Sequence, residues 1–243
     1  NSTLEPGGVA DFDIQLTNRG TEAITSTVLT IPIPTSVNAS SLTFNENINF
    51  TPSADYSAPN YDPDTNLGPN GAIVWNLGTL PLPSDPDDIL AEIGFKLTAT
   101  QDCTILSDPN FVPTISTNGF ISGTGEISDI SFNTPLIKGY ELNGTCIGEP
   151  IPTPIIIDID YVSYISTPPT IVCPGNISQN VDVGANGSLV TYTTPIGTDN
   201  ASGAITTQTA GLASGSLFPI GTTANTFVVT DTCGNTAECS FTV

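Results

Sequence analysis

Histidine and methionine are absent from this 243-residue chain, and basic residues are almost absent. Without histidine, every mechanism that needs an imidazole as general base, triad member or metal ligand is excluded. Arg19, Lys96 and Lys138 stand against 24 acidic residues, which gives a formal net charge of −21. The chain therefore cannot present the basic stripe that a phosphate backbone requires, so we expect no nucleic-acid partner.

Long hydrophobic runs are also missing. No stretch of about 20 apolar residues could cross a bilayer, and no signal peptide is visible. An anionic membrane surface would repel so acidic a chain, and we expect no direct membrane insertion. Because the sequence begins on a strand-like segment, we expect a mature product or an excised part of a longer protein.

Glycine and proline are abundant, with 22 and 21 copies that interrupt short runs of Val, Ile, Thr, Phe and Tyr. Many short strands joined by turns give this pattern, and it predicts an all-β chain. Only 11% of the residues are charged, so the chain is not an acidic disordered tail. Its polar surface must come mainly from Thr, Ser and Asn, a composition associated with proteins outside the cell.

The first predicted domain covers residues 1–148. After a turn at Pro6-Gly7-Gly8, the segment VADFDIQL alternates apolar and polar residues, and a second strand follows around residues 24–31. Such alternation buries one face of a sheet and exposes the other, as in a β-sandwich. The segment AIVWNL, residues 72–77, is a further predicted strand.

Residues 149–168 form a predicted linker. Pro150, Pro152 and Pro154 alternate, which favours a stiff extended path. An apolar run inside the linker would aggregate if it were exposed, so we expect it to pair with a neighbouring domain or chain. The residues of this predicted assembly strand are Ile155, Ile156, Ile157, Ile159 and Tyr161.

Residues 169–243 carry a specific set of motifs. The start PPTIVCPGNISQNVD, the turn FPIGTT, the corner VTDTCGNTA and the end CSFTV occur in order. Together they resemble a hyalin repeat (HYR) domain. That resemblance implies a second Ig-like sandwich, and a family found in adhesive extracellular proteins.

The N-terminal domain resembles, mainly over its first thirty residues, the conserved repeat of unknown function in bacterial surface proteins. The opening LEPGG, followed by the spaced D, I and LTN of the first strand, carries the likeness. As a whole, the chain resembles a segment of a large secreted surface adhesin of the flavobacterial type.

Five cysteines are present, without any CxxC pair, and their wide spacing favours disulfides in an oxidising compartment. Cys173 and Cys239 would join the first and last strands of the HYR-like domain, which are commonly neighbours in Ig-like sandwiches. Cys103 and Cys146 form the natural second bridge. Cys233 is left over: it stays free and buried, competes with Cys239 for Cys173, or pairs between chains.

HYR domains often carry another cysteine pair, at the positions occupied here by Asn186 and Ala201. The joint loss of both cysteines is expected if they form a mutual disulfide.

Calcium is the one candidate cofactor. Asp62, Asp64 and Asn66 have the spacing of the first ligands of an EF-hand loop, but Leu67 replaces its glycine and Ile73 its bidentate glutamate. The alternative is that these acids are solvated turn residues, for which Asp and Asn are favoured. Weaker candidates are Asp85, Asp87 and Asp88 in a Pro-rich turn, and Asp158 and Asp160 in the linker.

Carbohydrate binding is a second possibility, with Trp75, Tyr56 and Tyr61 as a stacking platform. Trp75 lies in an alternating strand, however, and is better explained as a core residue. No carboxylate pair is singled out as acid and nucleophile, so we expect a non-enzyme. The favoured function is a structural and adhesive module that contacts neighbouring domains, copies of itself, or surface glycans and proteins. The alternative is a carbohydrate- or calcium-binding accessory domain of a secreted enzyme.

Overall fold

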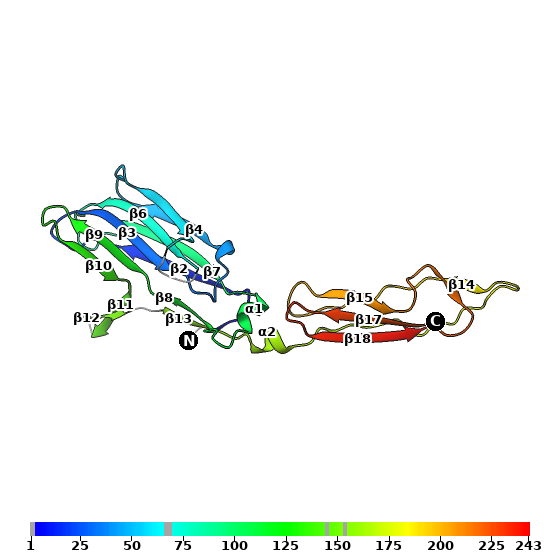
Figure 1. Ribbon diagram of the computed structural model, residues 1–243. Helices are drawn as coiled ribbons and strands as arrows, with labels where there is room; N and C mark the ends of the chain where they lie inside the picture. Colours follow the sequence, from blue (N-terminus) through cyan, green and yellow to red (C-terminus); the bar gives the residue numbers. More distant parts are fainter. Residues whose placement is uncertain (1–2, 66–69, 144–145, 153–154) are drawn as a thin grey trace. The chain divides into compact units, whose positions relative to one another are not determined.

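A computed structural model describes residues 3–65, 70–143, 146–152 and 155–243 (Figure 1). Almost all of its regular structure is β-strand, which confirms the predicted all-β class. The chain divides into two compact units, an N-terminal unit of residues Asn1–Tyr161 and a C-terminal unit of residues Val162–Val243. Among the described residues, no helix has the length and apolar character needed to cross a membrane.

Two antiparallel sheets form the body of the N-terminal unit. One has the strand order β10 (Ser131–Pro135), β9 (Phe120–Gly125), β3 (Ile24–Pro32), β6 (Ala72–Leu80) and β5 (Ser57–Asp62). The other has the order β2 (Val9–Leu16), β7 (Ala91–Thr98) and β4 (Thr43–Ile48). Alternate residues of both sheets enter one shared core, as the sequence periodicity predicts.

Aromatic and branched side chains fill this core. Trp75 in β6 and Leu29 in β3 are fully buried, and Phe12 in β2 stacks on Phe95 in β7 at 5.1 Å between ring centroids. Trp75 is thus a core residue, as its alternating strand indicates, and large aromatic side chains dominate the energetics of such cores.

A third sheet closes the unit, and it corrects the linker prediction. β13 (Ile155–Ile159) pairs in parallel with β1 (Thr3–Leu4) and antiparallel with β8 (Thr114–Thr117). Ile159 and Ile115 join the core. Residues 155–161 therefore belong to the N-terminal unit, and the prediction that 149–168 is one linker is wrong for them. The sequence indicated extended backbone correctly, but extended backbone suits a strand as well as a linker.

The same pairing changes the interpretation of the predicted assembly strand. β8 pairs with residues 155–158 of β13, and β1 pairs on the other edge with Asp158 and Ile159, so the run is not an unpaired strand awaiting another chain. Ile157 and Ile159 pack on the core, and Tyr161 makes an edge-to-face contact with Phe111 at 5.2 Å. Ile156 is half exposed, and the side chain of Ile155 lies outside the described residues. The need of this run for a partner is therefore met within the chain.

The remaining elements of the N-terminal unit are short. β11 (Ile137–Asn143) and β12 (Cys146–Pro152) form an antiparallel ribbon. A 3₁₀ turn covers Ala39–Ser41, and the helix α1 covers Cys103–Leu106. Asp102 caps α1, because its carboxylate accepts hydrogen bonds from the backbone N–H of Thr104 at 2.8 Å and from its hydroxyl at 2.6 Å.

The C-terminal unit begins with the helix α2 (Val162–Ser166) and consists otherwise of strands and extended segments. β15 (Ile205–Ala210), β17 (Ala224–Thr230) and β18 (Thr236–Thr242) form one sheet, and β14 (Gly187–Val190) pairs with β16 (Ser216–Pro219). Figure 1 shows β15, β17 and β18 side by side, with β14 towards the end where the chain terminates. Tyr192, Phe227 and Phe241 form an aromatic cluster in its interior.

The VTDTCGNTA motif is explained by one turn between β17 and β18. The carboxylate of Asp231, only 6% exposed, accepts from the backbone N–H and the side-chain amide of Asn235, both at 2.8 Å. Gly234 has a φ of 89°, which an L side chain rarely adopts. The polar residues Asp231 and Asn235 of this motif therefore hold the turn itself.

Truncating the core tryptophan tests this fold. We expect Trp75→Ala to lower the free energy of unfolding of the N-terminal unit by about 3–5 kcal/mol, because the indole is fully buried. Urea denaturation followed by circular dichroism measures the change. Val112→Ala, at a position 62% exposed, is the control and should alter stability by less than about 0.5 kcal/mol. A loss below about 1 kcal/mol for Trp75→Ala would contradict the described core.

Candidate functional site

The cysteines define the first structural site. Cys173 and Cys239 are joined by a disulfide of 2.05 Å with their Cα atoms 5.6 Å apart, the pair expected from the HYR-like motifs. It links the segment that follows α2 to β18, across 66 residues of sequence. Closing a loop of that length stabilises the fold by about 4 kcal/mol in the chain-entropy model. A unit this small depends on such a contribution.

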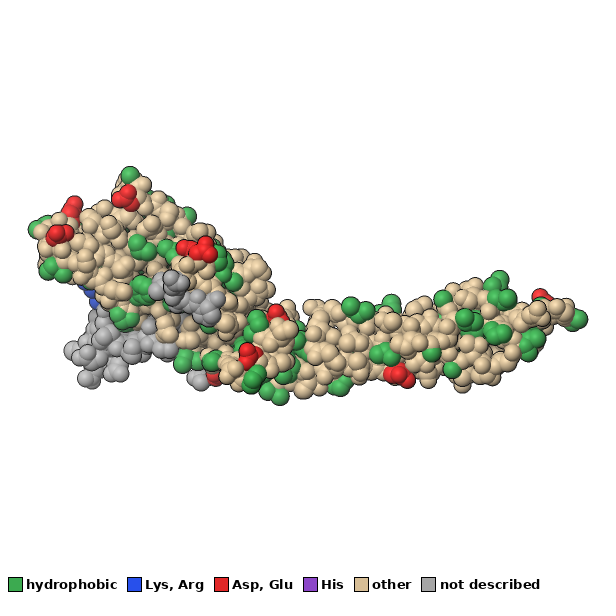
Figure 2. All heavy atoms as spheres, viewed as in Figure 1, with side chains coloured by type: hydrophobic (Ala, Val, Ile, Leu, Met, Phe, Trp, Pro, Cys, Tyr) green, Lys and Arg blue, Asp and Glu red, His purple; other side chains and the backbone are tan. Residues whose placement is uncertain are grey.

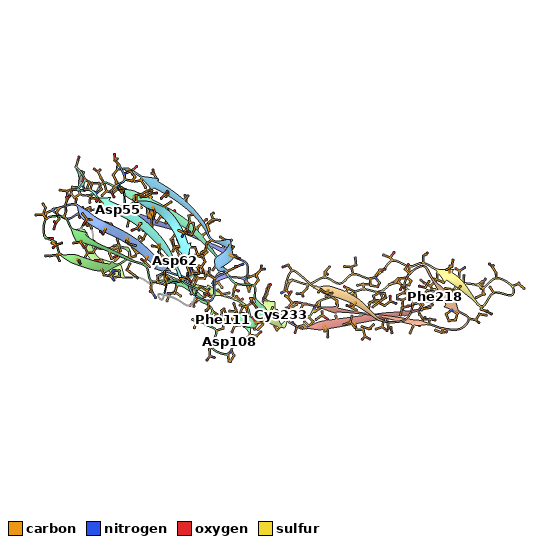
Figure 3. The ribbon with its side chains drawn as sticks, turned by 45° about the horizontal axis from the view of Figure 1, so that its top comes forward. Asp55, Asp62, Asp108, Phe111, Phe218 and Cys233 are labelled. Atoms are coloured by element: carbon orange, nitrogen blue, oxygen red, sulfur yellow. A yellow bond between two sulfur atoms is a disulfide. The ribbon has the colours of Figure 1, made fainter. Side chains whose placement is uncertain are left out.

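Cys233 lies in the turn between β17 and β18 (Figure 3). Cys233 and Cys103 both take part in disulfides, so the prediction of a free, buried Cys233 thiol is wrong. The sequence leaves Cys233 without an assigned partner, because separation along the chain does not show which cysteines are close in space. The predicted Cys103–Cys146 bridge involves a side chain outside the described residues, and it stays a prediction.

The positions of Asn186 and Ala201 cannot form a mutual disulfide in this fold. Asn186 lies beside Ile220, before the start of β17, because its carbonyl accepts from the Ile220 N–H. Near Ala201, Gly203 lies against Thr232, which follows β17. Seven strand residues separate the two ends of β17, or about 20 Å at roughly 3.3 Å per residue. Disulfide Cα atoms lie within about 7 Å, so the expectation of a mutual pair is corrected.

The calcium candidate is only partly within the described residues. Asp62 ends β5, and its Oδ1 accepts from the backbone N–H of Asp64 at 2.9 Å (Figure 3). Asn66 lies outside the described residues. Across 3–65, 70–143, 146–152 and 155–243, no group of three or more acidic or cysteine side chains is positioned to hold a metal ion. The structure thus shows a turn at Asp62 and leaves the calcium hypothesis a prediction.

Two of the other candidate acids, Asp85 and Asp88, accept hydrogen bonds from backbone N–H groups. Asp85 accepts from the N–H of Asp87 at 2.9 Å, and Asp88 accepts from the N–H of Asp85 at 3.2 Å. Asp87 forms an ion pair with Arg19 at 2.7 Å. Asp158 lies in β13, and the backbone N–H of Asp160 donates to the carbonyl of Leu4 at 2.8 Å.

Removal of calcium distinguishes the two interpretations of Asp62 and Asp64. We expect EDTA to leave the melting temperature unchanged, because calcium takes six to eight oxygen ligands and one of these two carboxylates already closes a turn. Calorimetry of the full chain in EDTA and in millimolar calcium measures the difference. A calcium-dependent rise in Tm that Asp64→Asn abolishes would establish the calcium site instead.

The three aromatic residues of the predicted carbohydrate platform do not lie on one open surface. Trp75 is fully buried. The Tyr56 hydroxyl donates to Glu46 Oε1 at 2.7 Å, and the Tyr61 hydroxyl donates to the carbonyl of Asn70 at 2.6 Å. Burial first, and then the bond to Glu46, raise the pKa of Tyr56. With the indole unavailable for stacking, this group is a poor sugar platform.

Of the carboxylates whose side chains the structure describes, two have lowered pKa values, and each acts on a turn or helix end. At the turn between β9 and β10, Glu22 accepts hydrogen bonds from Ser128, by its side chain and its N–H, and from the Ile127 N–H, which lower its pKa. The hydroxyl and then the N–H of Thr104 lower the pKa of Asp102 in the same way. Both shifts arise from local backbone capping, so neither marks a catalytic pair.

The Glu22 interaction predicts a pH-dependent turn. Because its folded pKa is lowered, Glu22 stabilises the turn fully above its unfolded pKa of about 4.3, and the contribution disappears as the pH falls through the folded value. In Glu22→Gln, the amide protons of Ile127 and Ser128 should exchange faster at neutral pH and lose this acid dependence. Hydrogen exchange by NMR measures both effects. Glu126→Gln, an exposed neighbour in the same turn, is the control, and equal effects in both variants would contradict the assignment.

A cavity in the C-terminal unit was not predicted from the sequence. It has a volume of about 450 Å³ and is lined by three segments far apart along the chain, residues 176–181, 188–190 and 218–222, together with Thr242 at the end of β18 and Val243 after it. Phe218 lies at this site (Figure 3). The FPIGTT turn was recognised as a motif, but its proximity to residues 176–181 requires the tertiary fold.

The comparisons concern this C-terminal unit. Residues 166–243 match the family model of the HYR domain. Hyalin of Strongylocentrotus purpuratus is 38% identical over 87 residues, which cover 35% of this chain and 7% of that protein. Hyalin of Lytechinus variegatus is 31% identical over 93 residues, covering 38% of this chain and 17% of that protein. The chain thus spans less than a fifth of the length of these curated relatives.

The C-terminal part of the chain therefore contains a HYR domain, as its motifs predict. The likeness of the N-terminal unit to the conserved repeat of bacterial surface proteins stays a prediction.

Proposed function

We propose that the chain is a segment of an extracellular cell-surface protein, in which it serves as a structural and adhesive module. The HYR domain at residues 166–243 carries this proposal, because the family occurs in adhesive extracellular proteins. The disulfide between Cys173 and Cys239 supports it, since such bonds persist in oxidising compartments. The partners of such a module are neighbouring domains, further copies of the chain, or surface glycans and proteins.

A non-enzymatic role is part of the proposal. The chain contains no histidine, and the capped acids described above are occupied by turns and helix ends. General acid–base catalysis by a carboxylate at neutral pH is favoured when the protein environment raises its pKa towards about 7. The pKa values of Glu22 and Asp102 are lowered instead. The alternative of a carbohydrate-binding accessory domain built on Trp75 loses its support, because that indole is buried.

Assembly by strand exchange through residues 155–161 is not carried forward. β13 lies between β1 and β8, so donating it to another chain would break two existing strand pairings. Contact between copies in a larger adhesin therefore needs surfaces other than this strand.

Localisation and thiol chemistry test the proposal together. Antibodies raised against the chain should label intact cells of the source, and Cys173 and Cys239 of the native protein should resist alkylation until a reductant is added. Beads coated with the full chain should then adhere to one another or to those cells. Labelling only after permeabilisation, with both thiols reduced, would refute an extracellular module. Surface labelling without any bead adhesion would leave a structural role and refute the adhesive one.

A further inference from the structure

The cavity of the C-terminal unit lies between two segments that pair with different strands. The segment after Cys173 is held on β18: the Ile177 N–H donates to the carbonyl of Thr242, and the Thr242 N–H donates to Asn176 Oδ1, both at 2.9 Å. β14 pairs instead with β16. The space between this segment and the β14–β16 ribbon is the cavity of about 450 Å³, a size at which proteins bind small ligands.

The floor and the rim of this cavity differ in chemistry. Phe218 and Val190 are almost fully buried beneath it. Around them stand the neutral polar side chains of Ser178, Gln179, Ser188 and Thr222. Among the described residues, none of these four side chains has a hydrogen-bond partner within the chain. Their hydroxyl and amide groups are therefore available to a ligand.

Charge is absent from the lining side chains. The whole C-terminal unit contains four acidic residues and no lysine or arginine, and in the view of Figure 2 most of its surface is uncharged. A carboxylate, sulfate, phosphate or ammonium group placed in the cavity would lose hydration without gaining an opposite charge. Ionic ligands are therefore disfavoured.

A wholly apolar ligand is disfavoured for the opposite reason. Covering Ser188, Thr222 and Gln179 with hydrocarbon would leave their polar groups without partners, at a cost comparable to a lost hydrogen bond for each group. The cavity thus suits a ligand that is neutral, carries many hydroxyls and has an apolar face.

We propose that this cavity is a binding site for a neutral carbohydrate. The C–H face of a sugar ring packs on the exposed apolar side chains of Pro219 and Ile220, and the sugar hydroxyls exchange hydrogen bonds with the neutral polar rim. The proposal goes beyond the structural and adhesive role proposed above, because that role needs no ligand in this cavity.

Glycine at position 187 holds the wall of the site in place. A Cβ atom there would clash with the carbonyl oxygen of Phe218, so a side chain would push β14 away from β16. The register places Ser188 directly opposite Phe218, which brings the hydroxyl and the aromatic ring to the same cavity. The β14–β16 pairing therefore forms one wall of the site, and residues 176–181 and the turn after β16 form the rest.

An array of immobilised oligosaccharides tests the proposal with the full 243-residue chain. The array carries neutral oligosaccharides, sialylated and sulfated ones, and apolar peptides. We expect binding to neutral members, and the double variant Ser188→Ala with Thr222→Val should weaken it by about tenfold or more, as expected for two lost hydrogen bonds. Thr207→Val, an exposed residue of β15 outside the cavity, is the matched control and should retain binding within about twofold.

A variant that introduces a charge distinguishes a change in binding from a loss of folding, because an unfolded protein would not change its ligand preference. Gln179→Lys, at an exposed position, should move binding from neutral towards sulfated and sialylated members, because it places a cation on the rim. Near-ultraviolet circular dichroism checks that each variant is folded. Binding of the original chain to acidic glycans or apolar peptides alone, absence of binding to any neutral member, or equal binding by the double variant and the control would each overturn the proposal.

Discussion

Several carboxylates of this chain have backbone N–H groups as partners, and with three cations for 24 acids few of them can pair with a basic side chain. Glu22 accepts from the turn between β9 and β10, Asp102 from the first turn of α1, and Asp231 from the turn before β18. Hydrogen bonds to a charged acceptor are stronger than neutral ones, so these acids fix the turns on which strand register depends. The acidic cluster of Asp85, Asp87 and Asp88 is therefore explained as a hydrogen-bonded turn.

This constraint also separates the two units by surface chemistry. Twenty of the acids lie in residues 1–161 and four in residues 162–243, so the C-terminal unit can offer neutral surfaces while the N-terminal unit cannot easily do so. Its cavity is lined by Ser, Thr and Gln side chains with no charge among them. In a strongly anionic chain, an uncharged region is the part that repels another anionic surface least.

The alternation of apolar and polar residues predicts the strands that have one buried and one exposed face. The pattern predicts strands at residues 9–16 and 72–77, which the structure has as Val9–Leu16 and Ala72–Leu80, and the HYR motifs locate the C-terminal unit and its Cys173–Cys239 pair. The pairing of Ile155–Ile159 with residues 3–4 and 114–117 was not found, because a continuous apolar run looks the same in a linker, an exchanged strand or a central strand. The cavity was missed for a related reason, since its lining comes from segments that only the tertiary fold unites.

The two turn motifs of the HYR domain differ in whether the fold accounts for all of their residues. At one end of the domain, Asp231 and Asn235 satisfy each other, so the fold accounts for both residues. At the other end, the FPIGTT turn contributes Phe218 to the interior and Gly221 with a φ of 123°, which the fold also explains. Thr222 of the same turn has no partner within the described chain, and it stands beside the cavity. A hydroxyl that the fold does not need is well placed to serve a ligand, which is why the glycan test is aimed at that residue.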